Sequence, residues 1–440
     1  MNSISAESRT PNHVMQTSLR RPSRAGIVVR LASLAIAGLT SAPRVAHAQA
    51  VACAINGPAN ALIPAISATV TGDILSLAAG CVYVLNIANN TNVTLGDNGL
   101  PLINKRLTIK GNGAIIMRSA AAGTPNFRIT EIAPGGDLTL DRVTLDNGNA
   151  SGTQRAGRGG GIYNLGTLKI EHSILSNNVA AEGGGGIGNG DAQEDAPPNP
   201  AHAILMLSDD STLSENTAAA NGGAIANGFT STMNLSDCTI SDNKSGGGAG
   251  IGSQGTAILN KCTITGNSAL IGGGIANAGH LFLTDSPVTG NNTTGTGSTG
   301  GFGGGIFNNA PGSLTLTHSD VTGNNATNDG GGIANVPNAT TTLTDSDVTA
   351  NSTTQDGAGI ANAGHMTLTH SNVTGNNATH KGAGISNKQL SNSPIASLTL
   401  THSDVTGNLA GDSDGGVFNQ TGNRVTLNDS TVTGNTPDDF

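Results

Sequence analysis

Apolar and polar positions alternate in this chain over stretches of only a few residues. Leu314-Thr315-Leu316-Thr317 is typical: the leucines fall on one face of an extended strand and the threonines on the other. Glycine or asparagine separates such stretches, so each one predicts a short, half-buried strand that ends in a turn. Strands this short cannot bury their own apolar face, and the pattern therefore predicts that they stack on one another.

From Gly159 onward the pattern recurs ten times as GGGI-x-N, a short turn and L-x-L-T-[HD]-S-x-V-T-G-N. Each unit has one aliphatic anchor, and successive anchors lie 24 to 38 residues apart; the longest gaps predict surface loops at residues 190–203 and 293–302. The anchors are Ile162, Ile187, Ile225, Ile251, Ile275, Ile306, Ile333, Ile360, Ile385 and Val417. Repeats of this kind predict an all-β solenoid, a parallel β-helix of about fourteen coils, with an N-terminal cap.

Asparagine recurs at two places in the unit. The first series stands two residues after each anchor, with Ser253 in one unit, and comprises Asn164, Asn189, Asn227, Asn277, Asn308, Asn335, Asn362, Asn387 and Asn419. The second closes each unit and comprises Asn177, Asn216, Asn243, Asn267, Asn291, Asn324, Asn351, Asn376, Asn408 and Asn435. Because an asparagine amide can bond the same group one coil along, we expect both series to form structural files.

Other repeat folds fit less well. Leucine-rich repeats need a helix-forming segment, which these Gly-, Asn- and Thr-rich units lack, and propeller blades need longer repeats with a Trp signature. Calcium-binding nonapeptide repeats need GGxGxD every nine residues, which does not occur. Composition agrees with a narrow aliphatic core: the 440 residues include 64 Gly, seven Phe, two Tyr and no Trp. With 11% charged residues and a net charge of −9, we expect no nucleic-acid partner.

The N-terminus has the order of a secretory signal peptide, which we place at residues 1–48. Arg20, Arg21, Arg24 and Arg30 precede an apolar stretch, and small residues converge on Ala46-His47-Ala48 and Ala48-Gln49-Ala50. The apolar stretch is too short to span a bilayer, and no other stretch reaches that length. We therefore expect a secreted or cell-surface protein with no transmembrane segment after cleavage.

The four cysteines agree with export. Their positions pair Cys53 with Cys81, and Cys238 with Cys262, and the second pair occupies the same place in successive units. An alternative use remains open for Cys53, which follows Ala50-Val51-Ala52 and could accept a lipid as a lipoprotein cysteine.

The segments GGGIYNLGTLKIEHSILSNN, GGGIANAGHLFLTDSPVTGNN and GGGIFNNAPGSLTLTHSDVTGNN resemble the repeats of secreted bacterial right-handed parallel β-helix proteins of the pectate-lyase-like superfold. That group includes polymorphic outer-membrane-protein and adhesin-type repeats. The resemblance covers residues 53–440. It implies a cap and irregular first coils at residues 49–158 and regular coils at residues 159–440. The superfold hosts lyases, hydrolases, epimerases, phage spikes and adhesins, so the resemblance leaves function open.

Catalytic signatures are sparse. After Arg158 the chain has one arginine, Arg424, and five scattered lysines; the hydrolase signatures Asn-Thr-Asp and Gly-His-Gly do not occur. We therefore expect a non-catalytic, adhesin-like or glycan-binding structural protein without a cofactor. A polysaccharide lyase or glycoside hydrolase is the alternative. We also expect an uncapped C-terminal end that pairs with a partner or frays.

Two polar surface files remain. The first is a histidine or charged residue that follows each Leu-Thr. It gives a candidate binding file of His318, Asp345, His370, His402 and Asp429. Residues in one straight file cannot surround a metal ion, so we expect this file to be a solvated turn. Outward threonines align as Thr315, Thr342, Thr367, Thr399 and Thr426, as Thr317, Thr344, Thr369 and Thr401, and as Thr265, Thr289, Thr322, Thr349, Thr374, Thr406 and Thr433. They suit an exposed strand face, and ice binding is a minor alternative.

Overall fold

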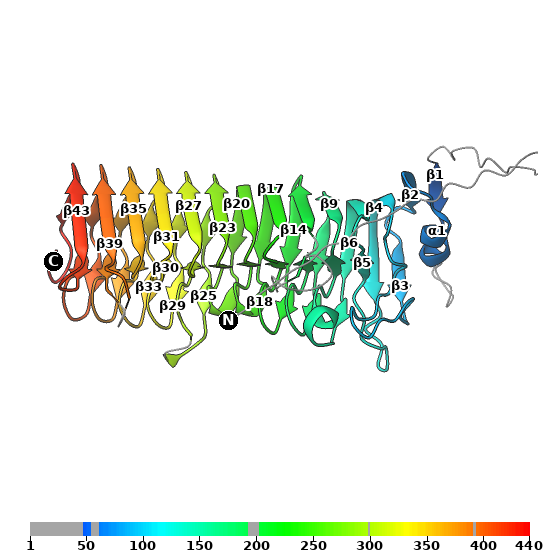
Figure 1. Cartoon of the computed structure of the whole chain (residues 1–440), viewed down its shortest axis with the longest axis horizontal. Helices are drawn as coiled ribbons and strands as arrows, with labels where there is room; N and C mark the ends of the chain where they lie inside the picture. Colours follow the sequence, from blue (N-terminus) through cyan, green and yellow to red (C-terminus); the bar gives the residue numbers. More distant parts are fainter. Residues whose placement is uncertain (1–46, 54–60, 192–201, 298–299, 390–392) are drawn as a thin grey trace, which may run out of the picture. The chain divides into compact units, whose positions relative to one another are not determined.

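The computed structural model describes residues 47–53, 61–191, 202–297, 300–389 and 393–440, which belong to one compact unit spanning residues 45–440. This unit is a right-handed parallel β-helix, as the repeat predicted (Figure 1). All but two residues of the expected signal peptide lie outside the described residues. No helix in the described part is long and apolar enough to cross a membrane.

Three parallel sheets run along the solenoid. The wide sheet contains β1 (Ala48–Val51), β2 (Asp73–Leu77), β3 (Val82–Leu85), β4 (Arg106–Arg118), β6 (Asp137–Asp146), β9 (Thr167–Glu171), β10 (Ile174–Ser176), β13 (Ile204–Ser208), β14 (Ser211–Ser214), β17 (Thr232–Ser241), β20 (Thr256–Thr265), β23 (His280–Thr284), β24 (Val288–Thr289), β27 (Ser313–Thr317), β28 (Val321–Thr322), β31 (Thr340–Thr344), β32 (Val348–Thr349), β35 (His365–Thr369), β36 (Val373–Thr374), β39 (Ser397–Thr401), β40 (Val405–Thr406), β43 (Arg424–Asn428) and β44 (Val432–Thr433).

The anchor sheet begins with β5 (Thr130–Ile132), which precedes the regular repeat, and then contains one three-residue strand from each of the ten units: β8 (Ile162–Asn164), β12 (Ile187–Asn189), β16 (Ile225–Asn227), β19 (Ile251–Ser253), β22 (Ile275–Asn277), β26 (Ile306–Asn308), β30 (Ile333–Asn335), β34 (Ile360–Asn362), β38 (Ile385–Asn387) and β42 (Val417–Asn419). The short sheet contains β7 (Asn149–Ala150), β11 (Val179–Ala180), β15 (Thr217–Ala218), β18 (Lys244–Gly247), β21 (Ser268–Ile271), β25 (Asn292–Thr293), β29 (Asn325–Ala326), β33 (Ser352–Thr353), β37 (Asn377–Ala378) and β41 (Leu409–Ala410).

Equivalent residues of successive coils stand in register. Ile306 pairs with Ile333, which pairs with Ile360, and all three are completely buried. The leucines of the wide sheet stack in the same way, since Leu316 pairs with Leu343. Continuous aliphatic files therefore fill the core that no single coil could bury.

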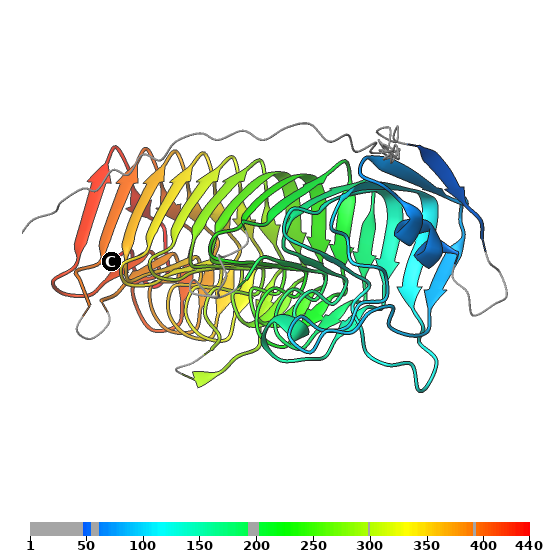
Figure 2. The ribbon, with the colours of Figure 1, turned by 45° about the vertical axis from the view of Figure 1, so that its right-hand side comes forward.

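A short helix closes the core at its N-terminal end. In α1 (Leu62–Ala68), Leu62, Ala65 and Ile66 are buried in the same cluster as the first strands, and β1 pairs with β2 (Figure 2). The 3-10 helix η1 (Gln154–Gly157) precedes the first regular coil. At the other end Asp439 Oδ1 accepts hydrogen bonds from the backbone N–H and the Nδ2 of Asn435, both 3.0 Å long, in the position that another asparagine fills in earlier coils.

The asparagines form two internal ladders. In the first series each Nδ2 donates to the Oδ1 one coil along, as from Asn335 to Asn362 at 2.9 Å, and Ser253 Oγ substitutes where the series lacks asparagine. The second ladder begins with Asn178, which donates to Asn216 at 3.0 Å, and the expectation that Asn177 belongs to it is wrong. Asn177 has φ 55° and occupies the left-handed position that Gly323 holds elsewhere.

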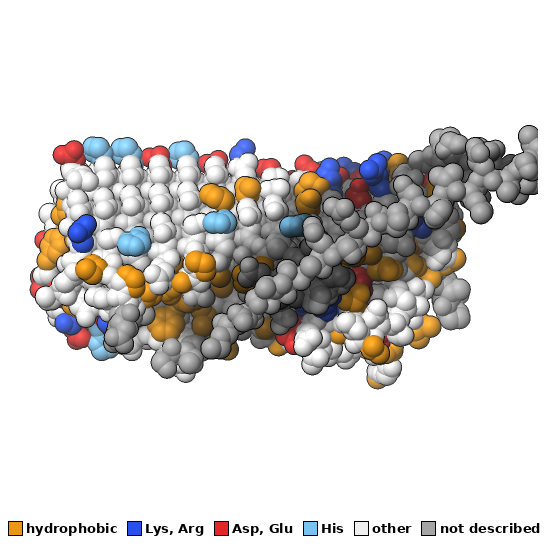
Figure 3. Space-filling view, in the orientation of Figure 1, with side chains coloured by type: hydrophobic (Ala, Val, Ile, Leu, Met, Phe, Trp, Pro, Cys, Tyr) orange, Lys and Arg blue, Asp and Glu red, His pale blue; other side chains and the backbone are white. Residues whose placement is uncertain are grey.

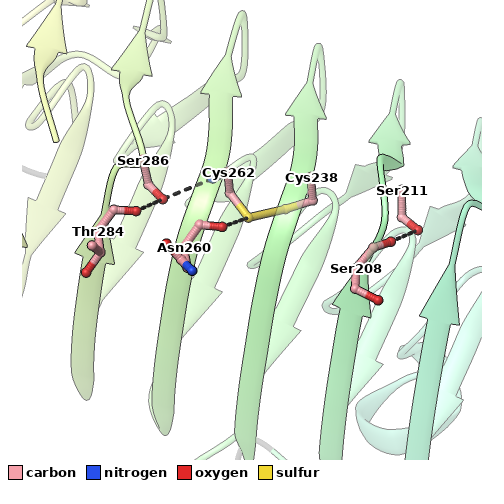
Figure 4. Close-up of a disulfide and its surroundings, with 7 residues drawn as sticks. All are labelled: Ser208, Ser211, Cys238, Asn260, Cys262, Thr284 and Ser286. Carbon is pink, nitrogen blue, oxygen red and sulfur yellow. Dashed lines mark hydrogen bonds between the residues drawn. A yellow bond between two sulfur atoms is a disulfide. The ribbon is translucent and has the colours of Figure 1, made fainter. Parts of the chain in front are cut away.

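Both cysteine pairs are disulfide-bonded, with Cα atoms 5.6 Å apart for Cys53–Cys81 and 4.5 Å apart for Cys238–Cys262. The second disulfide replaces two members of a buried serine file (Figure 4). In that file a serine hydroxyl accepts the backbone N–H of the preceding coil, as Ser286 Oγ does from Cys262 at 3.0 Å, and donates to a carbonyl of its own coil. The two cysteines thus exchange a hydrogen bond between coils for a covalent bond.

Candidate ligand-binding groove

A groove follows the outer face of the anchor sheet. Its floor is the middle residue of each anchor strand, which points outward because the flanking isoleucine and asparagine point inward. The floor residues pair in register in the order Ala226, Gly252, Ala276, Phe307, Ala334, Ala361, Ser386 and Phe418. Seven spacings of ~4.8 Å make this floor about 34 Å long. Small residues at most of these positions leave the floor open to a ligand.

Three adjoining cavities of about 320, 470 and 350 Å³ make up the groove. The first two share the lining residues Ile271 and Phe307, and the last two share Lys388, so the three cavities are neighbours along the sheet. A hollow of this length suits an extended ligand better than a compact one.

Three of the nine Phe and Tyr side chains of the chain line the groove. Phe302, Phe307 and Phe418 line the groove, half-buried, although the whole sequence has only seven Phe and two Tyr. The rings of Phe302 and Phe307 lie with their centroids 6.5 Å apart, and Lys381 Nζ lies 5.1 Å from the Phe418 ring centroid. The groove therefore offers exposed ring surface at two points along its floor.

Acidic and basic groups meet beyond the aromatic pair. Asp329 Oδ1 accepts the backbone N–H of Asp356 at 3.1 Å, and Lys388 Nζ donates to Asp356 Oδ2 at 3.3 Å. Burial, together with the negative charge of Asp356, raises the pKa of Asp329 above its ordinary value. Asp329 and Lys388 both line the 470 Å³ cavity, so the structure brings together a lysine that looked isolated in the sequence and two carboxyl groups.

Arg158 lines the end of the groove that is opposite to Asp329 and Lys388. Its residue exposure is 8%, and it borders the 320 Å³ cavity together with Asn221, Gly247 and Gln254. Burial lowers the pKa of Arg158 below its ordinary value. Sequence reasoning assigned it no role, because a single arginine before the first GGG gives no periodic signal.

The file of His318, Asp345, His370, His402 and Asp429 lies elsewhere, at the left-handed turn between the strands of the wide sheet. Figure 3 shows it as a row of histidines and acids along the edge of a face of uncharged polar side chains. The closest contacts in this file are weak: His318 Nε2 lies 3.7 Å from Asp345 Oδ2, His370 Nδ1 lies 3.9 Å from Asp345 Oδ1, and His402 Nε2 lies 3.5 Å from Asp429 Oδ2.

The imidazoles of His370 and His402 stack, with ring centroids 5.0 Å apart. Within the described ranges, no group of three or more His, Cys, Asp or Glu residues is placed to hold a metal ion. The surface file is therefore a succession of exposed neighbours one coil apart, and its residues do not converge on a common point.

The outward threonines follow the register that the sequence predicted. Thr315, Thr342, Thr367, Thr399 and Thr426 are paired strand by strand, as are Thr317, Thr344, Thr369 and Thr401. They belong to the wide sheet, and the groove belongs to the anchor sheet, so the two polar surfaces are on different faces of the solenoid.

No protein-family profile matches this sequence, and no curated protein matches it. Two solved structures are similar, both variants of the periplasmic alginate epimerase AlgG. They are 10% and 9% identical to this chain, with TM-scores of 0.41 and 0.38, and the alignments cover 82% of this chain and 77% and 76% of theirs. At this identity the similarity concerns the fold alone.

Proposed function

We propose that this protein is exported and binds an extended glycan in the groove on the anchor sheet, as a non-catalytic, adhesin-like β-helix. The observation that supports the proposal is the placement of Phe307 and Phe418 on a floor of otherwise small residues about 34 Å long, with Phe302 beside Phe307. The apolar face of a sugar ring packs on an aromatic ring, and asparagine, aspartate and lysine side chains at the rim can bond its hydroxyls. A polymer of equivalent units suits a floor built from equivalent strands.

Glycan arrays and calorimetry with the purified protein test the proposal. Replacing Phe307→Ala and Phe302→Ala removes the ring surface, and we expect at least tenfold weaker binding, about 1.4 kcal/mol. Phe282→Ala is the matched control, since Phe282 is 40% exposed but belongs to the wide sheet. Unchanged binding in the groove variants, or an equal loss in Phe282→Ala, would contradict the assignment.

Export is tested separately. We expect the mature protein outside the cytoplasm, beginning after Ala48 or Ala50, and N-terminal sequencing of the protein recovered from culture or periplasm identifies the cleavage site. Recovery of uncleaved chain from the cytoplasm alone would exclude this route. Metabolic labelling with a lipid would distinguish the lipoprotein alternative at Cys53.

A second candidate, a polysaccharide-active enzyme, is favoured by one observation. Asp329 faces the groove beside the ion pair of Asp356 and Lys388, and burial raises its pKa, the direction in which a carboxyl must shift to act as a general acid. Release of reducing ends or unsaturated products from a panel of polysaccharides, lost in Asp329→Asn, would establish it. Glycan binding without any product would support the non-catalytic function.

A further inference from the structure

We infer that Arg158 forms an oxyanion-binding subsite in the groove and that the glycan carries a carboxylate or a sulfate ester at that point. The inference rests on the proposed glycan binding and adds the charge of the ligand to it. It starts from an unusual property of Arg158: the side chain is buried, and its guanidinium forms no hydrogen bond or ion pair with the described part of the chain. A buried charge without compensation is strongly unfavourable in the folded state.

Arg128 shows how this chain compensates a buried arginine that serves structure. Arg128 is fully buried, and all its side-chain nitrogens donate: Nε to Arg158 O at 3.1 Å, Nη1 to Glu131 Oε2 at 3.3 Å and Nη2 to Ala156 O at 2.9 Å. Arg158 is one coil away, with no such partners. The difference indicates that the partner of Arg158 comes from outside the described chain.

Asp191, one of two acids that act electrostatically on Arg158, already has other hydrogen-bond partners. Asp191 accepts two hydrogen bonds from Arg155, at 3.0 and 2.6 Å, and a third from Tyr163 Oη at 2.5 Å. Both carboxylate oxygens of Asp191 therefore accept hydrogen bonds from other residues, and Asp191 and Glu182 attract the Arg158 charge only at longer range. This arrangement also holds Arg155 and Tyr163 in place beside Arg158.

The surroundings of Arg158 leave room for a ligand group. Gly188 lies beside Arg158, where a Cβ would be only 3.3 Å from Arg158 Cβ. Gly246 and Gly247 line the cavity, and because they have no side chains they leave space in it. A guanidinium presents its N–H groups in a planar fork that matches two oxygens of a carboxylate or sulfate. The cavity adjoins Phe307, so an anionic substituent at Arg158 and a sugar ring on Phe307 can belong to one chain.

The test compares the full-length mature protein with Arg158→Met, which keeps the volume and removes the charge, and with Arg158→Lys, which keeps the charge and removes the fork. Arg106→Met is the matched control, because the Arg106 side chain is 70% exposed on the wide sheet. Calorimetry uses a polyuronate, a sulfated glycan and a neutral glycan, and melting temperatures are measured with inorganic sulfate alone.

We expect the wild type to bind one acidic polymer at least tenfold more tightly than the neutral one, and Arg158→Met to lose this preference while retaining neutral binding and folding at least as stably without ligand. Preference for the polyuronate identifies the group as a carboxylate, and preference for the sulfated polymer identifies it as sulfate. Arg158→Lys should retain less than a tenth of the preference.

Equal affinity for acidic and neutral glycans in the wild type would overturn the inference. So would marked destabilisation of Arg158→Met without ligand, which would indicate a structural role. If no glycan binds, the proposed function fails; a rise in melting temperature with inorganic sulfate that Arg158→Met abolishes would then still support the oxyanion site, and no rise would overturn both.

Discussion

The second asparagine ladder predicts a large difference between two adjacent residues of one type. Asn376 is completely buried and takes part in four hydrogen bonds: its Nδ2 donates to Val348 O and to Asn408 Oδ1, both at 2.9 Å, and its Oδ1 accepts the backbone N–H of Asn351 at 2.9 Å and the Nδ2 of Asn351 at 3.0 Å. Asn377 is exposed on β37. Asn376→Ala removes all four bonds inside the protein.

At about 1 kcal/mol for each bond, with the Asn351 N–H left unpaired in the interior, Asn376→Ala should cost about 3–5 kcal/mol, and Asn377→Ala less than about 0.5 kcal/mol. Because stability in a solenoid is local, native-state hydrogen exchange is the appropriate assay. Amides of the coils on either side of Asn376 should exchange about a thousandfold faster in Asn376→Ala than in Asn377→Ala. Equal exchange in the two variants would refute the view that this ladder holds the coils together.

Three further predictions follow from other parts of the molecule. Replacing Cys238 and Cys262 with serine should lower the free energy of unfolding by about 3 kcal/mol, and replacing both with alanine should lower it by about 1 kcal/mol more, because serine restores the hydrogen bonds of the serine file. Urea unfolding midpoints of the two double variants check this, and equal midpoints would show that the file does not contribute to stability. The raised pKa of Asp329 means that the folded state holds this proton more tightly than the unfolded state, in which the pKa is near 3.8. The contribution of Asp329 to stability is therefore most favourable at low pH and falls as pH rises from about 3.8 through the folded pKa. Asp329→Asn should remove this fall and be more stable than the wild type at neutral pH. Unfolding midpoints measured from low to neutral pH check this, and parallel curves of midpoint against pH for the two proteins would contradict it. If the paired threonines bind ice, the protein will show thermal hysteresis that Thr342→Lys and Thr367→Lys abolish, and a wild type without hysteresis rejects ice binding.

The fold was predictable because equivalent positions of the sequence repeat become the paired residues of neighbouring coils. Once the anchors align in the sequence, coil-on-coil stacking is the only way to bury them, and Ile306, Ile333 and Ile360 pair as expected. The error at Asn177 has a local cause. The other units carry a residue other than asparagine at the left-handed turn, and Asn177-Asn178 offers two candidates for one buried position.

The groove could not be predicted in the same way. Periodicity identifies residues that every unit shares, and the groove depends on residues that single units carry. Alanine and glycine at the floor look like packing residues, and Arg158 stands just before the first regular unit. The α1 helix was not predicted for a related reason, since a segment of seven residues is too short to show a helical period of apolar positions.

The departures from the repeat coincide with the chemistry. The three longest intervals between anchors are 38, 31 and 32 residues, and the units that contain them carry Asp191, Phe302 and Lys388 respectively. Phe302 and Lys388 still stand in register with the neighbouring coils, since Phe302 O accepts the Gly272 N–H and the Lys388 N–H donates to Asn362 O. Both side chains line the groove, where they can contact a ligand without disturbing the core. The regular residues thus set the length and straightness of the floor. The irregular units decide which part of that floor is aromatic, which part is acidic and where the arginine end is held in place.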